Sequence, residues 1–219
     1  GVIGKNGDRV MKLYEFKAAP NPRRVRIFLA EKGIDVPTVQ IDLQNREQHT
    51  PEFLARNPMG GVPCLELDDG GHISESVAIC RYFEGLQPEP CLMGAMPEEA
   101  ARIEMWNRRM ELDGMAAAGE AFRNSVPAFA DRALPGIDPV AQIPDLAQRG
   151  KERLSRFYER LDEVLAKTPY VAGESYSIAD ITALVAIDFA GWIKIQPAES
   201  LVNIAGWYGR VSSRPSASA

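Results

Sequence analysis

Two short segments of the chain carry residues whose types and spacing suit the binding of a small peptide. In the first, residues 57–65, Val62-Pro63 follows a Gly-Gly pair and precedes an apolar run. Because the cis penalty of an X-Pro bond is only about 0.5–1 kcal/mol, the Val62–Pro63 bond is predicted to be cis. A cis bond turns the Val62 backbone outward, so that its N–H and C=O can pair with an extended peptide as a neighbouring strand would.

The second segment is Glu75-Ser76, which stands at the start of an apolar helical run. The Ser76 hydroxyl and the free backbone N–H groups of a first helical turn suit an anion, and Glu75 can hold a cation. An ordinary helix start is the alternative interpretation. With Val62-Pro63 upstream, the two segments together predict a pocket for a small peptide that carries an amine and a carboxylate at one end.

Length and composition narrow the class of protein. The 219 residues, 45% of them hydrophobic, suit one large or two small domains. A net charge of −5 without a long basic cluster argues against nucleic acid and against an anionic membrane surface as partners. No apolar run reaches the length of a membrane span and no secretory leader pattern is present, so a cytoplasmic location is expected. Residues 1–10, polar and Gly-rich, are interpreted as a tag or a disordered extension.

The cysteines and histidines indicate neither disulfides nor a metal site. Cys64, Cys80 and Cys91 form an odd set without paired motifs, which is typical of a reducing compartment. Only two histidines accompany them, so no metal is predicted. Cys64 and Cys80 are expected to be small buried apolar residues.

The order of elements predicts an α/β domain over residues 11–89. Asn21 is predicted to be the N-cap of the first helix, with Pro22 as its first helical residue and Gly33 as its stop. Thr50-Pro51 opens a short second helix. The strands are expected at 12–16, 36–43, 62–67 and 71–73, and a third helix at 76–86. This βαβαββα order is the thioredoxin-like arrangement.

Prolines at 88, 90 and 97 end that pattern, and residues 97–219 are predicted to form an all-helical domain. Helices are expected at about 98–122, 145–165 and 204–211, with an irregular Pro-rich insert between the first two. Ser177 and Asp180 form a capping box ahead of an almost wholly apolar helix, which should be the centre of this domain. The fold class is therefore α/β plus all-α.

These motifs, in this order, resemble the cytosolic glutathione transferases over nearly all of residues 11–219. The resemblance implies that the thioredoxin-like domain binds glutathione as cosubstrate. It also implies that the helical domain supplies most of the pocket for small-molecule electrophiles, and that the protein is a homodimer.

Carried over by position, the resemblance assigns glutathione-binding roles to five residues. Val62 would pair with the cysteinyl unit and Pro63 would be the cis proline, while Glu75 and Ser76 would hold the γ-glutamyl amine and carboxylate. Gln48-His49 resembles a pair in theta-like members, where the His meets the glycyl carboxylate; a solvated loop residue is the alternative for His49. Gly61 stands where theta-like members have Lys, which implies one charge contact fewer.

The group that activates the sulfur is less well defined. Most members place Tyr, Ser or Cys after the first strand, where this chain has Ala19. Asn21 is one candidate, because a Pro-Asn pair occurs in the nu-like bacterial branch and an amide at a helix start can stabilise a thiolate; a plain helix cap is its alternative. Ser125 is the other, by resemblance to a fungal and bacterial branch in which Ser and His hold a water, although no His stands beside Ser125.

Aromatic and apolar residues of the helical domain have two interpretations. Three of them recur on a predicted helix: Trp106, Met110 and Phe122. They belong either to the core or, together with Phe129, to an apolar pocket for the electrophile.

Three functions follow from these patterns. The first is conjugation of glutathione to hydrophobic electrophiles. The second is a glutathione-dependent disulfide or peroxide reductase, suggested by Pro20-Asn21 and the missing Ser or Tyr. The third, suggested by Ala19 and Gly61, is a binding or regulatory module of the same fold without chemistry.

Overall fold

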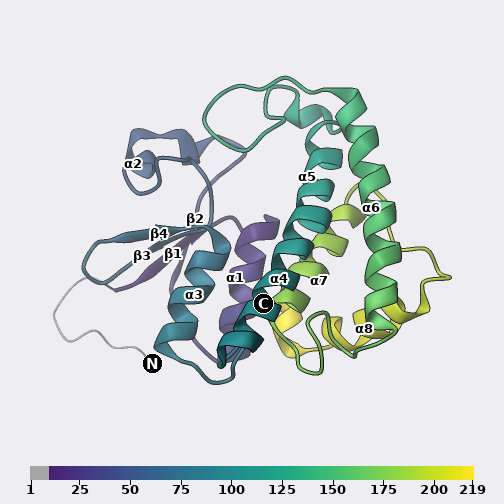
Figure 1. The fold of residues 1–219 in the computed structure, drawn as a ribbon. Coiled ribbons are helices and arrows are strands. Elements are labelled where there is room, and N and C mark those ends of the chain that lie inside the picture. The colour runs from purple at the N-terminus through teal and green to yellow at the C-terminus, as the bar shows by residue number, and fades with distance from the viewer. Residues whose placement is uncertain (1–9) are drawn as a thin grey trace. The chain divides into compact units, whose positions relative to one another are not determined.

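The computed structural model describes residues 10–219, which divide into two compact units (Figure 1). The first unit contains residues 10–90, Pro135–Ile137 and Ala219, and the second contains Cys91–Leu134 and Asp138–Ser218. Apart from Val10, the predicted extension 1–10 lies outside the described residues.

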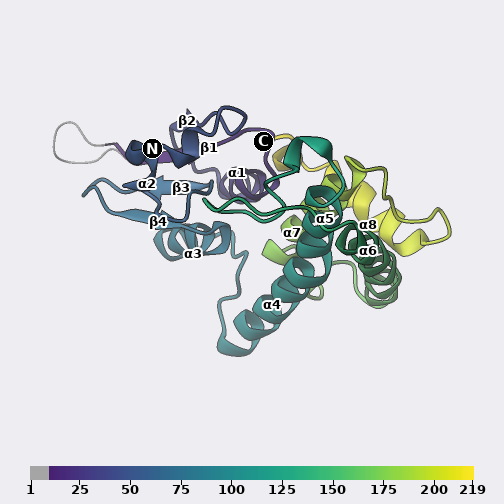
Figure 2. The ribbon, with the colours of Figure 1, turned by 90° about the horizontal axis from the view of Figure 1, so that it is seen from above.

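The first unit is built on a four-stranded sheet of order β2-β1-β3-β4. β1 runs parallel to β2 and antiparallel to β3, which pairs antiparallel with β4. Helices α1 and α3 pack together on one face of the sheet, and α2 lies on the other (Figure 2). The thioredoxin-like prediction is confirmed. The bounds are β1 (Lys12–Glu15), α1 (Pro20–Lys32), β2 (Thr38–Gln40), η1 (Glu47–His49), α2 (Pro51–Leu54), β3 (Cys64–Glu66), β4 (His72–Ser74) and α3 (Ser76–Leu86).

Two local predictions in this unit need correction. The second strand was predicted over residues 36–43, but β2 pairs with β1 over three residues only, and Pro37, which has no N–H to donate, precedes it. Asn21 was predicted to be an N-cap, but α1 begins at Pro20 and Ala19 holds the cap position without a side-chain hydrogen bond. Pro20 fits the first helical position because that position needs no backbone N–H.

The second unit is helical. A continuous helical run joins α4 (Pro97–Arg109), the π-helix η2 (Met110–Met115) and α5 (Ala116–Arg123). The sequence predicted this run as one helix, without the π segment. Within the π segment, Gly114 lies so close to Phe157 that a Cβ on Gly114 would stand 2.9 Å from the Phe157 ring. The remaining elements are η3 (Pro127–Phe129), α6 (Pro144–Leu165), α7 (Ile178–Gly191), α8 (Val202–Ser212) and η4 (Pro215–Ser218).

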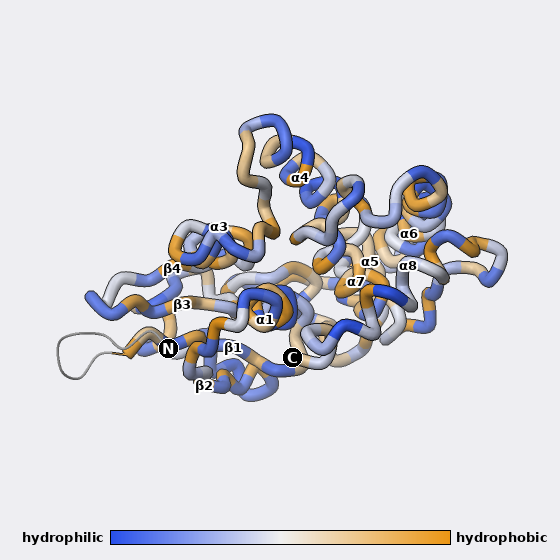
Figure 3. Tube along the Cα trace, turned by 90° about the horizontal axis from the view of Figure 1, so that it is seen from below, coloured by the Kyte–Doolittle hydropathy of each residue, from blue (hydrophilic) through white to orange (hydrophobic). Residues whose placement is uncertain are grey.

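Helix α7 forms the centre of the second unit, as predicted. Hydrophobic residues gather around α7 and α5 (Figure 3). The predicted capping box is present: the Ser177 Oγ accepts from the Ala179 N–H at 3.2 Å, and the Asp180 carboxylate accepts from the Ser177 N–H at 2.9 Å. Asp180 also accepts from the Trp207 indole at 2.8 Å, which ties α7 to α8. No helix of residues 10–219 is long and apolar enough to cross a membrane.

Candidate active site

The sheet topology brings three functional segments to one end of the first unit. Cys64 at the start of β3 pairs with Tyr14 near the end of β1 and with Ser74 at the end of β4. Because both pairings are antiparallel, the loop after β1, the segment before β3 and the segment after β4 meet at the same end of the sheet. Val62-Pro63 and Glu75-Ser76 are therefore neighbours, although β3 and β4 separate them along the chain.

The turn before β3 presents the Val62 backbone. The Val62–Pro63 bond is cis, as predicted. Asn57, 4% exposed, shapes the turn: its Nδ2 donates to the Gly61 carbonyl at 2.8 Å and its Oδ1 accepts from the Met59 N–H at 3.2 Å. Outside the regular elements, no backbone hydrogen bond of residues 10–219 involves Val62. Its N–H and C=O are thus open to an extended peptide.

His49 lies beside this turn because Gly60 has no side chain. Gly60 has φ +63°, and a Cβ there would stand 3.3 Å from the His49 ring and 2.8 Å from the Ile137 side chain. His49 ends the short helix η1 and is half-buried. The structure therefore places His49 next to the segment that leads to Val62. Ile137, which sequence reasoning did not single out, lies at the same point.

Glu75 has an uncommon backbone conformation at the start of α3. It occupies the cap position with φ 73° and ψ 122°, its side chain makes no capping hydrogen bond, and the residue is exposed. Such a conformation costs a non-glycine residue on the order of 1–3 kcal/mol and is concentrated at functional sites. Ser76 beside it is 4% exposed, and its hydroxyl donates to the Asn21 carbonyl at 3.2 Å.

Asn21 is exposed in the first turn of α1, and the oxygen of its side-chain amide accepts a hydrogen bond. Its Oδ1 accepts from Arg24 Nη1 at 3.3 Å. A guanidinium only donates, so this contact fixes which end of the amide is the oxygen. The NH₂ end is then the part of the Asn21 side chain that can donate to a ligand.

The backbone at the start of α1 offers a second donor at the same residue. Pro20 and Pro22 have no N–H, and the Arg23 N–H donates to the Ala19 carbonyl at 3.3 Å. Among the described residues of this first turn, the Asn21 N–H is therefore the one backbone donor that has no hydrogen-bond acceptor. An anion at the start of α1 would meet two donors from Asn21, together with the positive end of the helix dipole.

A buried carboxylate behind this loop was missed by sequence reasoning. Glu15, at the end of β1, is 2% exposed and bonds to Arg26 of α1 and Gln40 of β2. The only available sequence signal was strand alternation, which places Glu15 on the same face as the buried Leu13.

Ser125, the other candidate for activating the sulfur, lies in the second unit just beyond α5. It is exposed, and its hydroxyl donates to the Ala121 carbonyl at 2.6 Å. Because that bond uses the hydroxyl hydrogen, Ser125 can take part with a water only as an acceptor.

Two of the four predicted electrophile-pocket residues lie together. The rings of Phe122 and Phe129 meet edge to face with centroids 4.9 Å apart. Phe189 and Trp192 extend this cluster, with centroids 5.2 and 5.7 Å from that of Phe122, and Trp192 is 52% exposed. Sequence reasoning missed both, because Phe189 lies within the almost wholly apolar α7 and Trp192 directly follows that helix.

The other two predicted pocket residues lie apart from that cluster. The Arg109 guanidinium stacks 4.5 Å from the centroid of the Trp106 ring. Met110, 3% exposed, begins η2 and belongs to the core of the second unit. No ring contact of the described residues joins Trp106 to Phe122 or Phe129.

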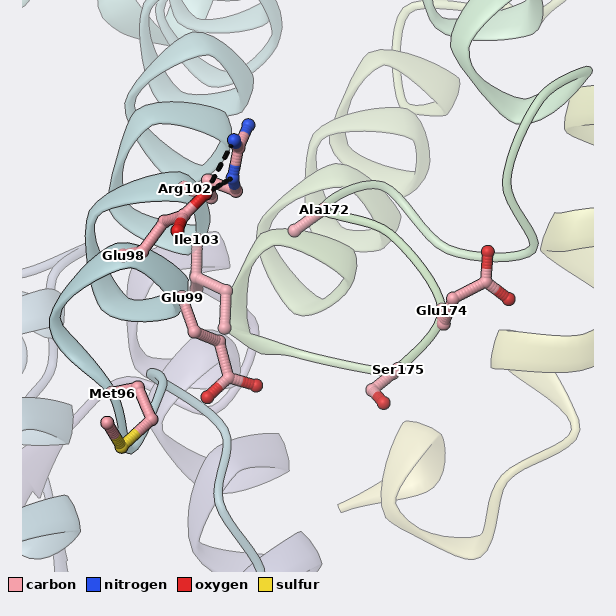
Figure 4. A pocket seen from close by; sticks show the side chains of 8 residues that line it. All are labelled: Met96, Glu98, Glu99, Arg102, Ile103, Ala172, Glu174 and Ser175. Atoms are coloured by element: carbon pink, nitrogen blue, oxygen red, sulfur yellow. Dashed lines mark hydrogen bonds and ion pairs between the residues drawn. The ribbon is translucent and has the colours of Figure 1, made fainter.

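A cavity of about 420 Å³ beside the first turns of α4 has a different character (Figure 4). Three carboxylates line it, and Glu98 pairs with Arg102 at 2.8 Å. The loop before α7 supplies Glu174 and Ser175 (Figure 4). An acidic lining does not suit an apolar electrophile, and none of the predicted pocket residues contributes to it. No group of three His, Cys, Asp or Glu within residues 10–219 is arranged to hold a metal ion.

Comparison with known proteins identifies the family. The profile described as "Glutathione S-transferase, N-terminal domain" matches residues 18–86, and that described as "Glutathione S-transferase, C-terminal domain" matches residues 127–215. Glutathione S-transferase 2 of Saccharomyces cerevisiae is 39% identical over 99% of this chain and 93% of its own length.

Two solved structures are similar to this chain in both sequence and fold. A glutathione S-transferase domain-containing protein from Marinobacter aquaeolei VT8 is 38% identical with a TM-score of 0.88, and Gtt2 from Saccharomyces cerevisiae is 37% identical with a TM-score of 0.87. Each alignment covers 94% of this chain and 98% of the other. With this identity extending through both units, the chain belongs to the glutathione S-transferase family, as its ordered motifs predicted.

Proposed function

We propose that this protein binds glutathione, stabilises its thiolate and transfers it to hydrophobic electrophiles. The observation that carries the proposal is the meeting of the open Val62 backbone, Glu75-Ser76 and the donors of Asn21 at one end of the sheet. These groups match the parts of glutathione: a peptide backbone, an amino acid end and a sulfur. The naming of the yeast relative as a glutathione S-transferase supports the same activity.

Each part of glutathione has a proposed partner. The cysteinyl unit pairs with the Val62 backbone beside Pro63, in the manner of an added strand. The γ-glutamyl amine meets Glu75, and its carboxylate meets Ser76 at the start of α3. His49 meets the glycyl carboxylate at the far end, since it lies beside the turn that leads to Val62.

The chemistry requires the thiolate, because a free thiol with a pKa of about 8.5 is only a few per cent ionised near neutrality. The Asn21 N–H and amide would donate to the sulfur and lower its pKa. The thiolate then forms a bond to the electrophilic carbon, the leaving group departs with its electron pair, and the thiol proton passes to solvent. Catalysis comes from positioning and thiolate stabilisation.

The electrophile is proposed to bind against the aromatic cluster of Phe122 and Phe129. Apolar electrophiles suit this cluster because its rings are only partly buried and Trp192 extends it. Trp106 and Met110, proposed with them from the sequence, have less support, since Met110 is core and Trp106 stacks with Arg109.

The protein is further proposed to act as a cytoplasmic homodimer. Support for the dimer comes from its family, and support for the cytoplasmic location comes from its three cysteines, an odd number without paired motifs, which is typical of a reducing compartment. Light scattering after gel filtration should give about twice the chain's mass of 24.1 kDa. A mass equal to one chain at micromolar concentration would contradict the dimer.

Binding and chemistry can be tested in sequence. Glutathione at ten times its Kd should stabilise the folded protein by about 1.4 kcal/mol, which differential scanning fluorimetry would detect. S-methylglutathione should stabilise it as well, since the methyl group leaves the peptide contacts in place. Conjugation of glutathione to chlorodinitrobenzene should then be observed. Absence of any stabilisation by either ligand would favour the non-catalytic module.

A second candidate is reduction of mixed disulfides, favoured by the loop of residues 17–21, which contains no hydroxyl or thiol side chain. The glutathione thiolate would attack the glutathione sulfur of a mixed disulfide, break the S–S bond, release the substrate thiolate and form oxidised glutathione. Turnover of the glutathione–mercaptoethanol disulfide without conjugation of chlorodinitrobenzene would select this function.

A further inference from the structure

We infer that Arg26 is a positioning residue, which with Glu15 and Gln40 holds the loop that places the Asn21 donors against the glutathione sulfur. This role rests on the proposed function, because it concerns the ionisation of bound glutathione. It involves residues of one unit only, from β1, α1 and β2.

The centre of the arrangement is the buried carboxylate of Glu15. Glu15 is 2% exposed, and its two oxygens are divided between two partners. Oε2 forms an ion pair with Arg26 Nη1, and Oε1 accepts from Gln40 Nε2 at 2.9 Å. A buried carboxylate needs such partners, and here they also orient the side chains of Arg26 and Gln40.

Both oriented side chains bond to the backbone of Lys17, in the loop after β1. The Lys17 N–H donates to Gln40 Oε1 at 2.9 Å, and the Lys17 carbonyl accepts from Arg26 Nη2 at 2.9 Å. The four residues therefore form a closed ring of hydrogen bonds. Since the backbone N–H and C=O of Lys17 are both hydrogen-bonded, the loop is fixed in place and in orientation.

This loop leads directly to the donors proposed for the sulfur. Beyond Lys17 the chain makes a turn, in which the Ala19 N–H donates to the Phe16 carbonyl at 2.9 Å, and then enters α1. Ala19 supplies no hydroxyl, so donation depends on the Asn21 backbone and its short side chain. Such donors cannot adjust by rotating a long side chain, and a misplacement of about 1 Å can cost about 10²-fold in rate.

The forked shape of the guanidinium is needed for this role. Arg26 uses Nη1 for Glu15 and Nη2 for the Lys17 carbonyl. Lysine at this position would keep a charge beside Glu15 but could not reproduce both bonds in that geometry. Arg26→Lys therefore separates loop positioning from neutralisation of the buried carboxylate.

The test measures the thiol pKa of glutathione bound to the full chain, from the ultraviolet absorbance of the thiolate against pH. For Arg26→Lys we expect this pKa to rise by about 0.5–1 unit and kcat near neutrality to fall by about three- to tenfold. The Kd for S-methylglutathione should change less than about twofold, because its peptide contacts lie elsewhere. Gln40→Met, on the exposed β2, removes the Lys17 N–H acceptor and should shift the thiol pKa in the same direction.

Arg56→Lys is the matched control. Arg56 is also partly buried in the first unit and pairs with Glu52 at 3.1 Å and Glu66 at 3.8 Å, but it does not bond to the loop. Its substitution should leave the thiol pKa unchanged even where the melting temperature falls. A wild-type thiol pKa in both Arg26→Lys and Gln40→Met, or an equal shift in Arg56→Lys, would overturn the positioning role. Wild-type protein that binds glutathione without lowering its thiol pKa would instead overturn the proposed thiolate stabilisation and this role with it.

Discussion

The Ser76 hydroxyl donates a hydrogen bond to the backbone carbonyl of Asn21 at 3.2 Å. This bond joins the start of α3, where the γ-glutamyl carboxylate is proposed to bind, to the start of α1, where the sulfur is proposed to bind. Ser76 is 4% exposed, so the contact is protected from solvent. Binding of the amino acid end of glutathione and placement of the thiolate donors are therefore coupled through one residue, whose N–H is open to the carboxylate and whose hydroxyl holds Asn21.

Ser76→Ala should consequently affect both ends of glutathione. The loss of a neutral hydrogen bond that holds the start of α3, worth about 0.5–1.5 kcal/mol, predicts a Kd for S-methylglutathione raised about two- to tenfold, while the Ser76 N–H stays available to the carboxylate. The thiol pKa of bound glutathione should rise too, because Asn21 loses its anchor. Calorimetry and ultraviolet titration would measure the two effects. A change in Kd with an unchanged thiol pKa would show that the two ends are independent.

Two substitutions at Asn21 separate donation from charge. Asn21→Ala removes the amide donor but keeps the backbone N–H, so the thiol pKa of bound glutathione should rise by only about half a unit. Asn21→Asp replaces the donor with a carboxylate near the thiolate, and like charges disfavour ionisation, so its thiol pKa should rise further. Equal thiol pKa values in wild type and Asn21→Asp would remove Asn21 from the mechanism.

The backbone of Glu75 predicts opposite changes in stability and binding. At φ 73°, glycine avoids a steric cost that glutamate bears, so Glu75→Gly should keep or raise the free energy of unfolding, by up to about 1 kcal/mol. The same change removes the carboxylate proposed for the γ-glutamyl amine and should weaken glutathione binding. Urea unfolding and calorimetry measure the two quantities.

The matched variant for that test is Glu75→Gln, which keeps the backbone strain and loses the charge. It should bind glutathione as poorly as Glu75→Gly without any gain in stability. Destabilisation by Glu75→Gly of about 1 kcal/mol or more would mean that the strain is absent or that Glu75 has another structural role.

Local features of the fold were predictable because their causes lie within a few residues. Gly33 ends α1 with φ 63°, the Thr50 hydroxyl caps α2, and the Ser177 capping box opens α7. The Val62–Pro63 cis bond likewise depends on an X-Pro step and its turn. The wrong prediction of Asn21 as the N-cap of α1 also has a local cause. Pro20 and Pro22 are each suited to the first helical position, so the sequence allowed two starts for this helix.

Contacts between distant elements were not predictable in this way. The ring around Glu15 joins three elements, and neither strand alternation nor helix spacing indicates that Arg26 and Gln40 face the same carboxylate. The approach of Ile137 to Gly60 brings together segments far apart in sequence. Such relationships depend on tertiary packing, which periodicity in one element does not encode.

The three cysteines should differ sharply in reactivity. Cys64 is fully buried, and burial raises the pKa of its thiol to about 11, so that near pH 8 about one part in a thousand is thiolate. Cys80 is 1% exposed, whereas Cys91 is half-buried. Dithionitrobenzoate should modify Cys91 first and reach the other two only on unfolding. In Cys91→Ser the rapid phase should vanish, and its persistence would place a reactive thiol at Cys64 or Cys80.

Two glycine-to-alanine substitutions in helices of the second unit should have opposite effects. At Gly150 in α6 a Cβ would stand 2.7 Å from the Ala121 backbone nitrogen and 2.8 Å from the Ala117 carbonyl, so α5 and α6 must separate to admit it. Overpacking of this kind typically costs about 1–3 kcal/mol.

Gly209 in α8 is the control, because a Cβ there would meet nothing within 4 Å. Gly209→Ala should stabilise the protein by up to about 1 kcal/mol through the higher helix propensity of alanine. Chemical denaturation of both variants measures the difference.

Since α5 carries Phe122 and ends just before Ser125, Gly150→Ala should also alter the KM for the electrophile while leaving the Kd for S-methylglutathione near its wild-type value. Stabilisation by both substitutions would show that α5 and α6 are packed less closely than the structure indicates.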